Sequence, residues 1–525
     1  MRLSFALCAL LLCAVATAQD LAKDKSLKKV MALPDKEAIK SRIKYLADDK
    51  LVGRKPGTPG FQMAVDFVIE QFKSLGVQPK GDDGYLQKVV LRTGKVDSTK
   101  QSFFWNGTPL KLGRDVVIMP DMNNATNQGE ADVIFIGTGI SAPHLGHDDL
   151  AGIDVKGKIV LMIAGVPEKF PASERAHFNS MVMRAEMAAA KGAIGAIAVV
   201  SEQGFNQLKA GSFGGSRGIV NKGGSVSSRS VPMNPSIKFC AVGNTKYFTP
   251  IVEKLKRGDI VGKVKAQSAT SYTDVVSYNV IGWIEGSDAK LKNEFVIHTA
   301  HLDHVGKGAP VNGDSVYNGA HDNASGVACA LEIAKLYKNS KMKRSVMIAL
   351  VTAEEMGLLG SFYLAANPPV EKKSIVANIN TDMPTLIAPL LSIEPLGAKH
   401  SSIMNEVVKA AAYLNLEVQE DHIPDQVRFV RSDQYSFIRE GIPALAVKYG
   451  LKVNDPTLDL KKKIDDWTKE HYHKPSDEYR EEAFDFDAAL TYVRLNYLIG
   501  YQIANAKKRP TWNKGDFFGD TFGKP

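Results

Sequence analysis

The chain has 525 residues, of which 44% are hydrophobic and 23% are charged, and its formal net charge is +9. This length predicts at least two domains, and the composition excludes a fibrous or broadly disordered protein. The positive charge is spread over segments of mixed sign, and no basic helix interleaved with aromatic residues is evident. The sequence therefore does not indicate a nucleic-acid-binding protein.

The N-terminus has the pattern of a secretory signal peptide. Arg2 precedes an apolar run, and Ala16-Thr17-Ala18 forms a cleavage site of small residues. We expect residues 1–18 to be removed, which leaves no transmembrane span and predicts a secreted or periplasmic protein. Only Cys240 and Cys329 then remain, both in apolar stretches that favour buried free thiols over a disulfide.

The next part of the chain predicts a linker, two helices and an inserted domain. A lysine-rich stretch, residues 19–34, has the composition of a mobile linker, and apolar spacing predicts helices over 35–48 and 61–75. From about 115 to 268 the pattern changes to short Val- and Ile-rich strands separated by Gly- and Ser-rich turns. Within this segment, the Gly-rich run 211–224 is expected to be a surface loop.

From about residue 272 onward, predicted strands and helices alternate. This alternation predicts an α/β domain in which helices sandwich a mixed central sheet, with the chemistry at strand ends. The predicted strands are 277–284, 294–300, 345–352, 375–381 and 443–448. The predicted helices begin after Asn323, near Leu358 and at Ser401, and cover about 433–440 and 488–506.

Metal-type ligands occur where these elements end or begin. His301 closes a predicted strand, and the carboxylate of Asp303, two residues later, can hold the second nitrogen of its ring. Asp322 directly precedes a predicted helix. There Asp322 or Asn323 can cap the helix, or the Asp322 carboxylate can bridge two cations about 3.5 Å apart.

Further carboxylates follow the next two predicted strands. Glu354 and Glu355 are neighbours in an extended segment and point different ways, so one can bind metal while the other acts as a base toward water. Asp382 ends the following strand. His473 lies in a loop, where Asp477 can orient its ring. Nitrogen and oxygen donors of this kind suit zinc.

Several motifs resemble the zinc-dependent aminopeptidase family that includes bacterial and fungal leucyl-type aminopeptidases and the glutamate carboxypeptidases. The resemblance covers about residues 278–501, and segments 46–49 and 53–60 resemble the part of such enzymes that precedes an inserted domain. Segments 152–161 and 184–200 resemble the protease-associated domain. The motifs are Ala300-His301-Leu302-Asp303, Asp322-Asn323-Ala324-Ser325-Gly326, Glu354-Glu355-Met356-Gly357, Asn380-Thr381-Asp382-Met383, Ser432-Asp433 with Gly441-Ile442-Pro443-Ala444, and Tyr472-His473.

The resemblance implies a phosphorylase/hydrolase-like zinc exopeptidase fold with an inserted, mostly β protease-associated domain. The implied division is a signal peptide 1–18, a linker 19–34, an N-terminal catalytic part 35–114, the insert 115–268, the main catalytic part 269–508 and a C-terminal tail 509–525. Its implied substrates are peptides with a free N-terminus. The sequence leaves their length, their side-chain preference and the oligomeric state open.

The resemblance also implies a role for each site residue. His301 and Asp382 would hold one Zn²⁺ ion, Glu355 and His473 a second, and Asp322 would bridge the two. Family members often have a cis peptide after this aspartate. The remaining roles are Glu354 as general base, Tyr472 as hydrogen-bond donor to the oxyanion, and Asp303 and Asp477 as supporting residues.

Four other histidines receive no role at this point. His298 alternates with apolar residues and is expected to be packed, and His471 is expected at the surface. His304 and His321 flank predicted ligands without matching the family motifs.

Three alternative functions remain. A glutaminyl cyclase shares the fold with a single zinc but lacks the equivalent of His301, which is present here. A carboxypeptidase would need a cationic pocket, which Arg428 or Arg431 can supply. A non-catalytic receptor-like protein would lack metal ligands or the base, and none is missing from this sequence.

Overall fold

The computed structural model describes residues 21, 24–229, 231 and 233–523, so the predicted signal peptide lies outside the described residues. The chain forms two compact units. The first unit combines Met1–Val89 with Val276–Pro525, and the second unit is Val90–Val275. The second unit begins earlier and ends later in the chain than the predicted insert, residues 115–268. Its two boundaries lie within β2 (Leu86–Val96) and β14 (Ile260–Ile284), and each of these strands continues into the first unit.

The first unit contains a mixed sheet, as predicted. β18, β15, β19 and β22 are mutually parallel neighbours, while β14 and β20 run antiparallel on either side of them. In spatial order the strands are β1 (Gln78–Pro79), β14, β18 (Ser345–Val351), β15 (Phe295–His301), β19 (Ile375–Asn380), β22 (Ala444–Tyr449), β20 (Ser392–Leu396) and β21 (Glu417–Val418). β16 (Gly306–Val311) and β17 (Asp314–Tyr317) form a separate hairpin.

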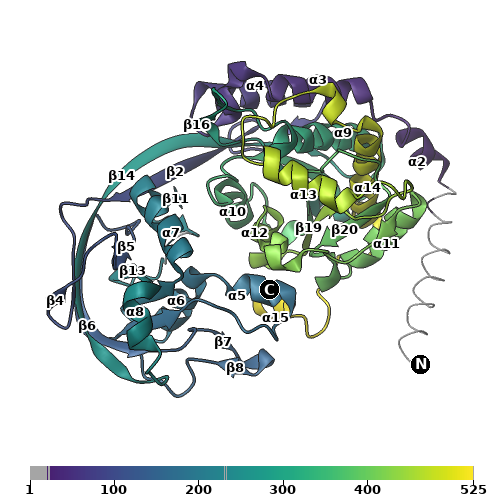
Figure 1. Cartoon of the computed structure of the whole chain (residues 1–525). Coiled ribbons are helices and arrows are strands. Elements are labelled where there is room, and N and C mark those ends of the chain that lie inside the picture. Colours follow the sequence, from purple (N-terminus) through teal and green to yellow (C-terminus); the bar gives the residue numbers. More distant parts are fainter. Residues whose placement is uncertain (1–20, 22–23, 230, 232, 524–525) are drawn as a thin grey trace. The chain divides into compact units, whose positions relative to one another are not determined.

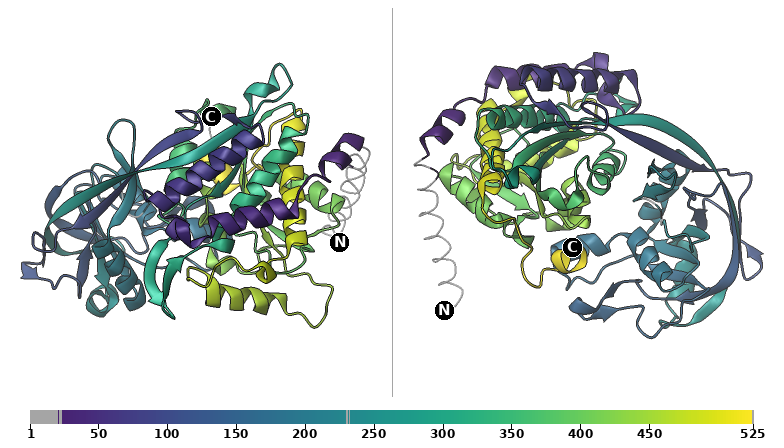
Figure 2. Two further views of the ribbon diagram at one scale, coloured as in Figure 1. Left: turned by 90° about the horizontal axis from the view of Figure 1, so that it is seen from above. Right: turned by 180° about the vertical axis from the view of Figure 1, so that it is seen from behind.

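Helices cover both faces of this sheet (Figures 1 and 2). Alternate residues of one strand enter different cores: Ile348 packs in one core, and its neighbours Met347 and Ala349 pack in the other. The first core includes α3 (Lys36–Leu46), α4 (Pro59–Ser74), α9 (Gly326–Lys338), α11 (Ile403–Tyr413) and α14 (Phe486–Asn505). The second includes α10 (Leu359–Ala366), α12 (Gln434–Arg439) and α15 (Phe517–Phe522).

Three elements of the first unit differ from the prediction. The stretch expected to be a linker contains α2 (Lys25–Val30), whose Leu27 packs in the core and whose first turn is capped by Asp24. The charged helix α13 (Leu460–His471) was not predicted, since only Leu460 in it is buried. In the C-terminal segment, Phe518 of α15 is fully buried.

The second unit combines strands of both directions with short helices. Its larger sheet runs β5 (Val116–Ile118), β13 (Phe239–Asn244), β10 (Gly195–Val200), β9 (Ile159–Ile163), β6 (Thr126–Phe135), β14, β3 (Ser102–Trp105) and β4 (Thr108–Pro109). β2 pairs with β11 (Ser216–Val220), which pairs with β12 (Val226–Ser228), and β7 (Ser141–Ala142) pairs with β8 (His147–Asp148). The helices are α5 (Ala172–Phe178), α6 (Met181–Ala190), α7 (Glu202–Gly214) and α8 (Thr245–Val252).

The Gly-rich run predicted as a loop is therefore partly regular structure, because α7 extends to Gly214 and β11 begins at Ser216. Cys240 and Cys329 are both free thiols. Within the described residues, no helix has the length and apolar character needed to cross a membrane. The assignment of the second unit to the protease-associated class remains a prediction.

Candidate metal centre

The predicted site residues of the first unit meet at the carboxyl ends of three parallel strands. His301 is the last residue of β15 and lies opposite Val351, the last residue of β18. Glu354 and Glu355 follow β18 directly. Asp382 follows β19, which is the neighbour of β15 on its other side. Parallel strands end at one edge of a sheet, so these side chains converge although they are far apart in sequence.

One group of donors consists of His301, Asp322 and Asp382. Nε2 of His301 lies 3.2 Å from Oδ1 of Asp322 and 3.5 Å from Oδ1 of Asp382. The His301 side chain is 1% exposed and that of Asp322 is 4% exposed, so water hardly reaches them. Lys448 donates to the backbone carbonyl of Asp382 and thereby helps to hold that residue in place.

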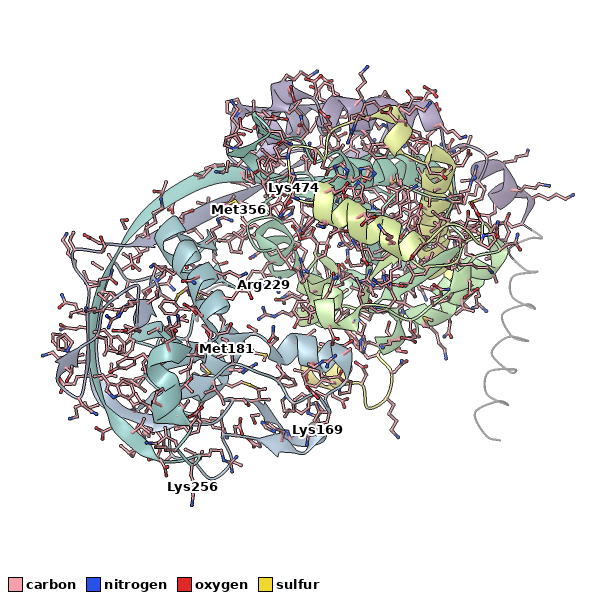
Figure 3. The ribbon with its side chains drawn as sticks, viewed as in Figure 1. Lys169, Met181, Arg229, Lys256, Met356 and Lys474 are labelled. Atoms are coloured by element: carbon pink, nitrogen blue, oxygen red, sulfur yellow. The ribbon has the colours of Figure 1, made fainter. Side chains whose placement is uncertain are left out.

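A second group shares Asp322 and adds Glu355 and His473. Nε2 of His473 lies 3.2 Å from Oδ2 of Asp322 and 3.0 Å from Oε2 of Glu355. Met356 and Lys474, which follow Glu355 and His473 in the chain, are labelled side by side in Figure 3. Each carboxylate oxygen of Asp322 thus faces one histidine, which is the arrangement that a bridging ligand requires.

The chemistry of both groups fits metal ions. Although Nε2 of His473 is close to two carboxylates, it has no aligned hydrogen-bond partner among the described residues. Donors that surround a common centre, rather than point at each other, produce this geometry. Burial alone would lower the pKa of His473, but the carboxylates of Asp322 and Glu355 raise it to about 10. The groups therefore attract positive charge, and a divalent cation can supply it.

The backbone around these donors is unusual in four places. The peptide bond between Asp322 and Asn323 is cis, as the resemblance implied. Ala353, Met383 and His473 have left-handed φ values of 56°, 44° and 53°. Such conformations are uncommon for residues with a side chain and concentrate at functional sites.

Asp303 supports the site differently from the prediction. The ring of His301 donates from Nδ1 to the backbone carbonyl of Asp303, at 3.1 Å, and not to its carboxylate. A carbonyl only accepts, so this contact still leaves the lone pair of Nε2 for a metal. The Asp303 carboxylate instead accepts the backbone N–H groups of Glu354 and Glu355, at 3.1 and 3.3 Å. It therefore fixes the loop after β18.

The Asp477 carboxylate also has partners other than the predicted one. Its two oxygens accept the backbone N–H groups of His321 and Asp322, at 2.9 and 3.0 Å. It therefore orients the segment that carries the shared Asp322, and it does not hold the ring of His473. The closeness of Asp477 and His473 in the sequence suggested the wrong partner for the Asp477 carboxylate, because the backbone turns at His473.

Sequence reasoning considered Asn323 only as a possible cap of the helix, although its side chain connects two ligand-bearing segments. Its amide nitrogen donates to the carbonyl of Thr381 at 3.0 Å. Its oxygen accepts from the backbone N–H groups of Gly326 and Met383, both at 3.1 Å. The start of α9 is thereby tied to the residues on either side of Asp382.

Arg54 is a second residue whose role the sequence did not reveal. Its guanidinium is buried and donates only to backbone carbonyls, those of Leu302 at 3.0 Å, Asn318 at 2.6 Å, Gly319 at 3.1 Å, and Leu46. Arg54 thus joins an N-terminal segment to the loops around His301 and Asp322.

Two further histidines also lie at the site. His304 contacts Glu355, with 2.8 Å between Nδ1 and Oε1. His321 stacks on Phe484, with ring centroids 4.0 Å apart and an angle of 8° between the rings, and packs against Trp467 of α13. Both are buried, whereas their positions beside the motifs gave no signal of a role.

Glu354 and Tyr472 have electrostatic surroundings suited to proton and hydrogen-bond chemistry. Burial raises the pKa of Glu354 well above its ordinary value, and the carboxylates of Asp433 and Asp382 add to the effect against the opposing charge of His301. Burial raises the pKa of the Tyr472 hydroxyl as well, so it stays protonated. The Tyr472 ring stacks on His473, with centroids 3.9 Å apart.

The two arginines considered for a carboxylate pocket differ. Arg428 is paired with Glu394 at 2.5 Å and also contacts Asp421, so its charge is already balanced. Arg431, which directly precedes Ser432-Asp433, is exposed, and its guanidinium donates to the carbonyl of Gln426 at 3.4 Å. Neither residue forms a buried cationic pocket.

Comparison with known proteins supports the family resemblance. Residues 279–496 match the family described as "Peptidase family M28". The chain is 29% identical over 286 residues to Aminopeptidase YwaD of Bacillus subtilis (strain 168), which covers 53% of this chain and 50% of that protein. It is 26% identical over 201 residues to the probable leucine aminopeptidase 2 of Aspergillus fumigatus, which covers 37% of each chain. The chain thus spans half or less of the length of these relatives.

Among solved structures, the aminopeptidase from Aneurinibacillus sp. strain AM-1 superposes with a TM-score of 0.51 at 20% identity. The alignment covers 92% of this chain and 97% of that chain. This likeness concerns the fold, and it agrees with the mixed sheet between two layers of helices.

Proposed function

We propose that the protein is a secreted zinc-dependent aminopeptidase that acts with two metal ions, and the match of residues 279–496 to peptidase family M28 supports this proposal. The two relatives from Bacillus subtilis and Aspergillus fumigatus, an aminopeptidase and a probable leucine aminopeptidase, support the activity. The observation that carries the proposal is the convergence of five donors on one edge of the sheet with Glu354 beside them.

The donor set divides into two metal subsites. His301 and Asp382 make the first, Glu355 and His473 make the second, and Asp322 belongs to both. Two imidazoles and three carboxylates are ligands that suit zinc, and the sets leave room for water and substrate. When bound, zinc ions lower the pKa of a water molecule and polarise the scissile carbonyl.

The side chains of the chain perform the proton transfers. Glu354 accepts a proton from the attacking water and then donates it to the departing amine of the N-terminal peptide bond. Its raised pKa makes Glu354 a stronger base toward the proton of water than an ordinary carboxylate is. The Tyr472 hydroxyl donates a hydrogen bond to the oxyanion of the tetrahedral intermediate.

The three alternatives have less support. A carboxypeptidase needs a buried cation for the substrate's terminal carboxylate. Arg428 is already paired with Glu394 and Asp421, and Arg431 is exposed and donates to the carbonyl of Gln426. A single-zinc cyclase would not need His301 within 3.5 Å of two carboxylates. A receptor-like protein would not need Glu354 next to a full set of donors.

The test compares wild type with Glu354→Gln, using purified mature protein and a mixed set of peptides. Zinc content and released amino acids are measured together. We expect wild type to hold about two zinc ions and to release N-terminal residues. The variant should keep its zinc and lose activity by about 10²- to 10⁴-fold, because the amide cannot accept the proton.

Glu371→Gln is the matched control, since Glu371 is exposed and precedes β19, whereas Asp382 follows the other end of that strand. It should retain full activity. Release of C-terminal residues by wild type would replace the proposal with a carboxypeptidase, and absence of both zinc and hydrolysis would replace it with a binding protein.

A further inference from the structure

His304 lies at the metal centre without belonging to the donor set described above. Its side chain is fully buried, and its Nδ1 lies 2.8 Å from Oε1 of Glu355. The ring packs closely on Gly319, where a Cβ atom would come within 2.6 Å of Cγ of His304. Gly319 also has a left-handed φ of 63°, so both its backbone and the space beside it require glycine.

The contact between His304 and Glu355 has a defined direction. An ionised carboxylate only accepts hydrogen bonds, so Nδ1 of His304 is the protonated nitrogen and donates to Oε1. The other oxygen, Oε2, faces Nε2 of His473 at 3.0 Å. His304 thus holds Oε1 of Glu355, and Oε2 points to the second subsite.

We propose that His304 is a positioning residue of the second metal subsite, where it holds Glu355 so that the carboxylate offers one oxygen, Oε2, to the metal ion beside His473. This inference rests on the proposed two-metal function. A hydrogen-bonded partner behind a metal ligand commonly accounts for about 10- to 100-fold of the metal affinity.

The same position allows a competing role that the experiment must separate. The donors of His304, Asp322 and Glu355 lie within 4.8 Å of one another, so the ring of His304 has the spacing of a direct ligand. However, its Nδ1 is 3.9 Å from the nearer oxygen of Asp322 and only 2.8 Å from Glu355. The shorter contact favours donation to Glu355.

His304→Ala and His304→Asn distinguish the two roles. The amide nitrogen of asparagine can take the place of Nδ1 as a donor to Glu355, but an amide is a poor zinc ligand. Zinc-free full-length protein is titrated with Zn²⁺ against a chromophoric chelator, which gives the affinity of each of two sites. We expect His304→Ala to bind one of its two zinc ions about 10- to 100-fold more weakly and His304→Asn to bind both nearly as wild type does.

His147→Ala is the matched control, because His147 belongs to the second unit and contacts Asp149 there. It should leave both affinities unchanged. Circular dichroism of the zinc-free proteins checks folding. If the alanine variant does not fold, His304→Gln replaces it, since its longer side chain moves the amide away from the position of Nδ1.

The outcomes are distinct. Two unchanged affinities in the alanine variant would remove any role of His304 at the metal. Equal loss of one zinc in the alanine and asparagine variants would make His304 a direct ligand and overturn the positioning role. Failure of wild type itself to bind zinc would instead overturn the proposed function.

Discussion

His298 and His301 are three residues apart on β15 but have opposite surroundings. Burial lowers the pKa of His298 to about 3, and the Nε2 of its ring lies 2.9 Å from the neutral hydroxyl of Tyr337. Burial would do the same to His301, but hydrogen bonds with Asp322 and Asp382 outweigh it and raise its pKa well above the ordinary value. An odd spacing on a strand places the two rings on opposite faces, and this alone decides their chemistry.

The depressed pKa of His298 predicts a loss of stability in acid. In the unfolded chain the ring binds a proton below about pH 6.5, whereas in the folded chain it does so only near pH 3. The unfolded state therefore gains a proton first, and stability falls as the pH drops from 6.5 toward 3. The contribution of this one group between pH 6.5 and 5 is about 2 kcal/mol.

Urea unfolding of wild type and His298→Gln at pH 7 and pH 5 checks this. Glutamine keeps a donor for Tyr337 and does not titrate, so the variant should lose about 2 kcal/mol less than wild type between the two pH values. The other titrating groups contribute equally to the stability of both proteins, so their contributions cancel in the comparison. Equal losses in both proteins would contradict the assigned burial of the ring.

At the scale of elements, Arg54 connects the N-terminal segment to the ligand loops. Burial lowers the pKa of its guanidinium to about 10, still far above neutrality, and carboxylates nearby favour the charged form. Those carboxylates are Asp322, Asp477, Asp303 and Glu355. The Arg54 cation thus balances the negative charge of these carboxylates, while its N–H groups hold three chain segments in place.

Arg54→Met should lower the free energy of unfolding by at least about 3 kcal/mol, because buried carbonyls lose their donors. It should also weaken zinc binding, since the loop that follows His301 and the segment that precedes Asp322 lose their common anchor. Arg54→Lys keeps the charge but not the planar fork, so its effects should be intermediate. Chemical unfolding and zinc titration measure both quantities. A methionine variant as stable as wild type would contradict this role.

The elements that the sequence predicted well have strong periodic patterns. The sequence predicted the helix α14 and the strands β15, β18 and β19, and these three strands are buried along their whole length. The donors at the ends of the strands were predicted from the motifs. α13 was missed although Leu460, Ile464 and Trp467 recur at helical spacing, because most of its other residues are charged and only Leu460 is buried.

Contacts between distant segments were not predictable in the same way. Arg54, Asn323 and His304 act through partners far away in sequence, and the partners of Asp303 and Asp477 depend on how the chain turns. Local patterns contain the ligands themselves, whereas the groups that hold those ligands are fixed by tertiary packing.

At the scale of the whole molecule, the donors all belong to one of the two units. Ions that bind only the folded first unit stabilise it, by about 4 kcal/mol for each site that is filled at 1,000 times its dissociation constant. Removing zinc with a chelator should therefore lower the melting temperature of the first unit and leave a transition of the second unit unchanged.

Differential scanning calorimetry with and without chelator measures this, and added Zn²⁺ should restore the original midpoint. The second unit, with its own core and sheet, serves as the internal control. A shift of both transitions, or of neither, would contradict the confinement of the metal centre to the first unit.

The separation of Arg54 from its partners has a consequence for the order of synthesis. Arg54 leaves the ribosome 248 residues before Leu302, whose carbonyl it will bind, and His473 and Asp477 emerge later still. Until they do, one subsite lacks its histidine and the Asp322 segment lacks the carboxylate that orients it. If the protein has the proposed function, the nascent chain cannot complete its second metal subsite, and so cannot act on peptides, until nearly the whole first unit has been translated.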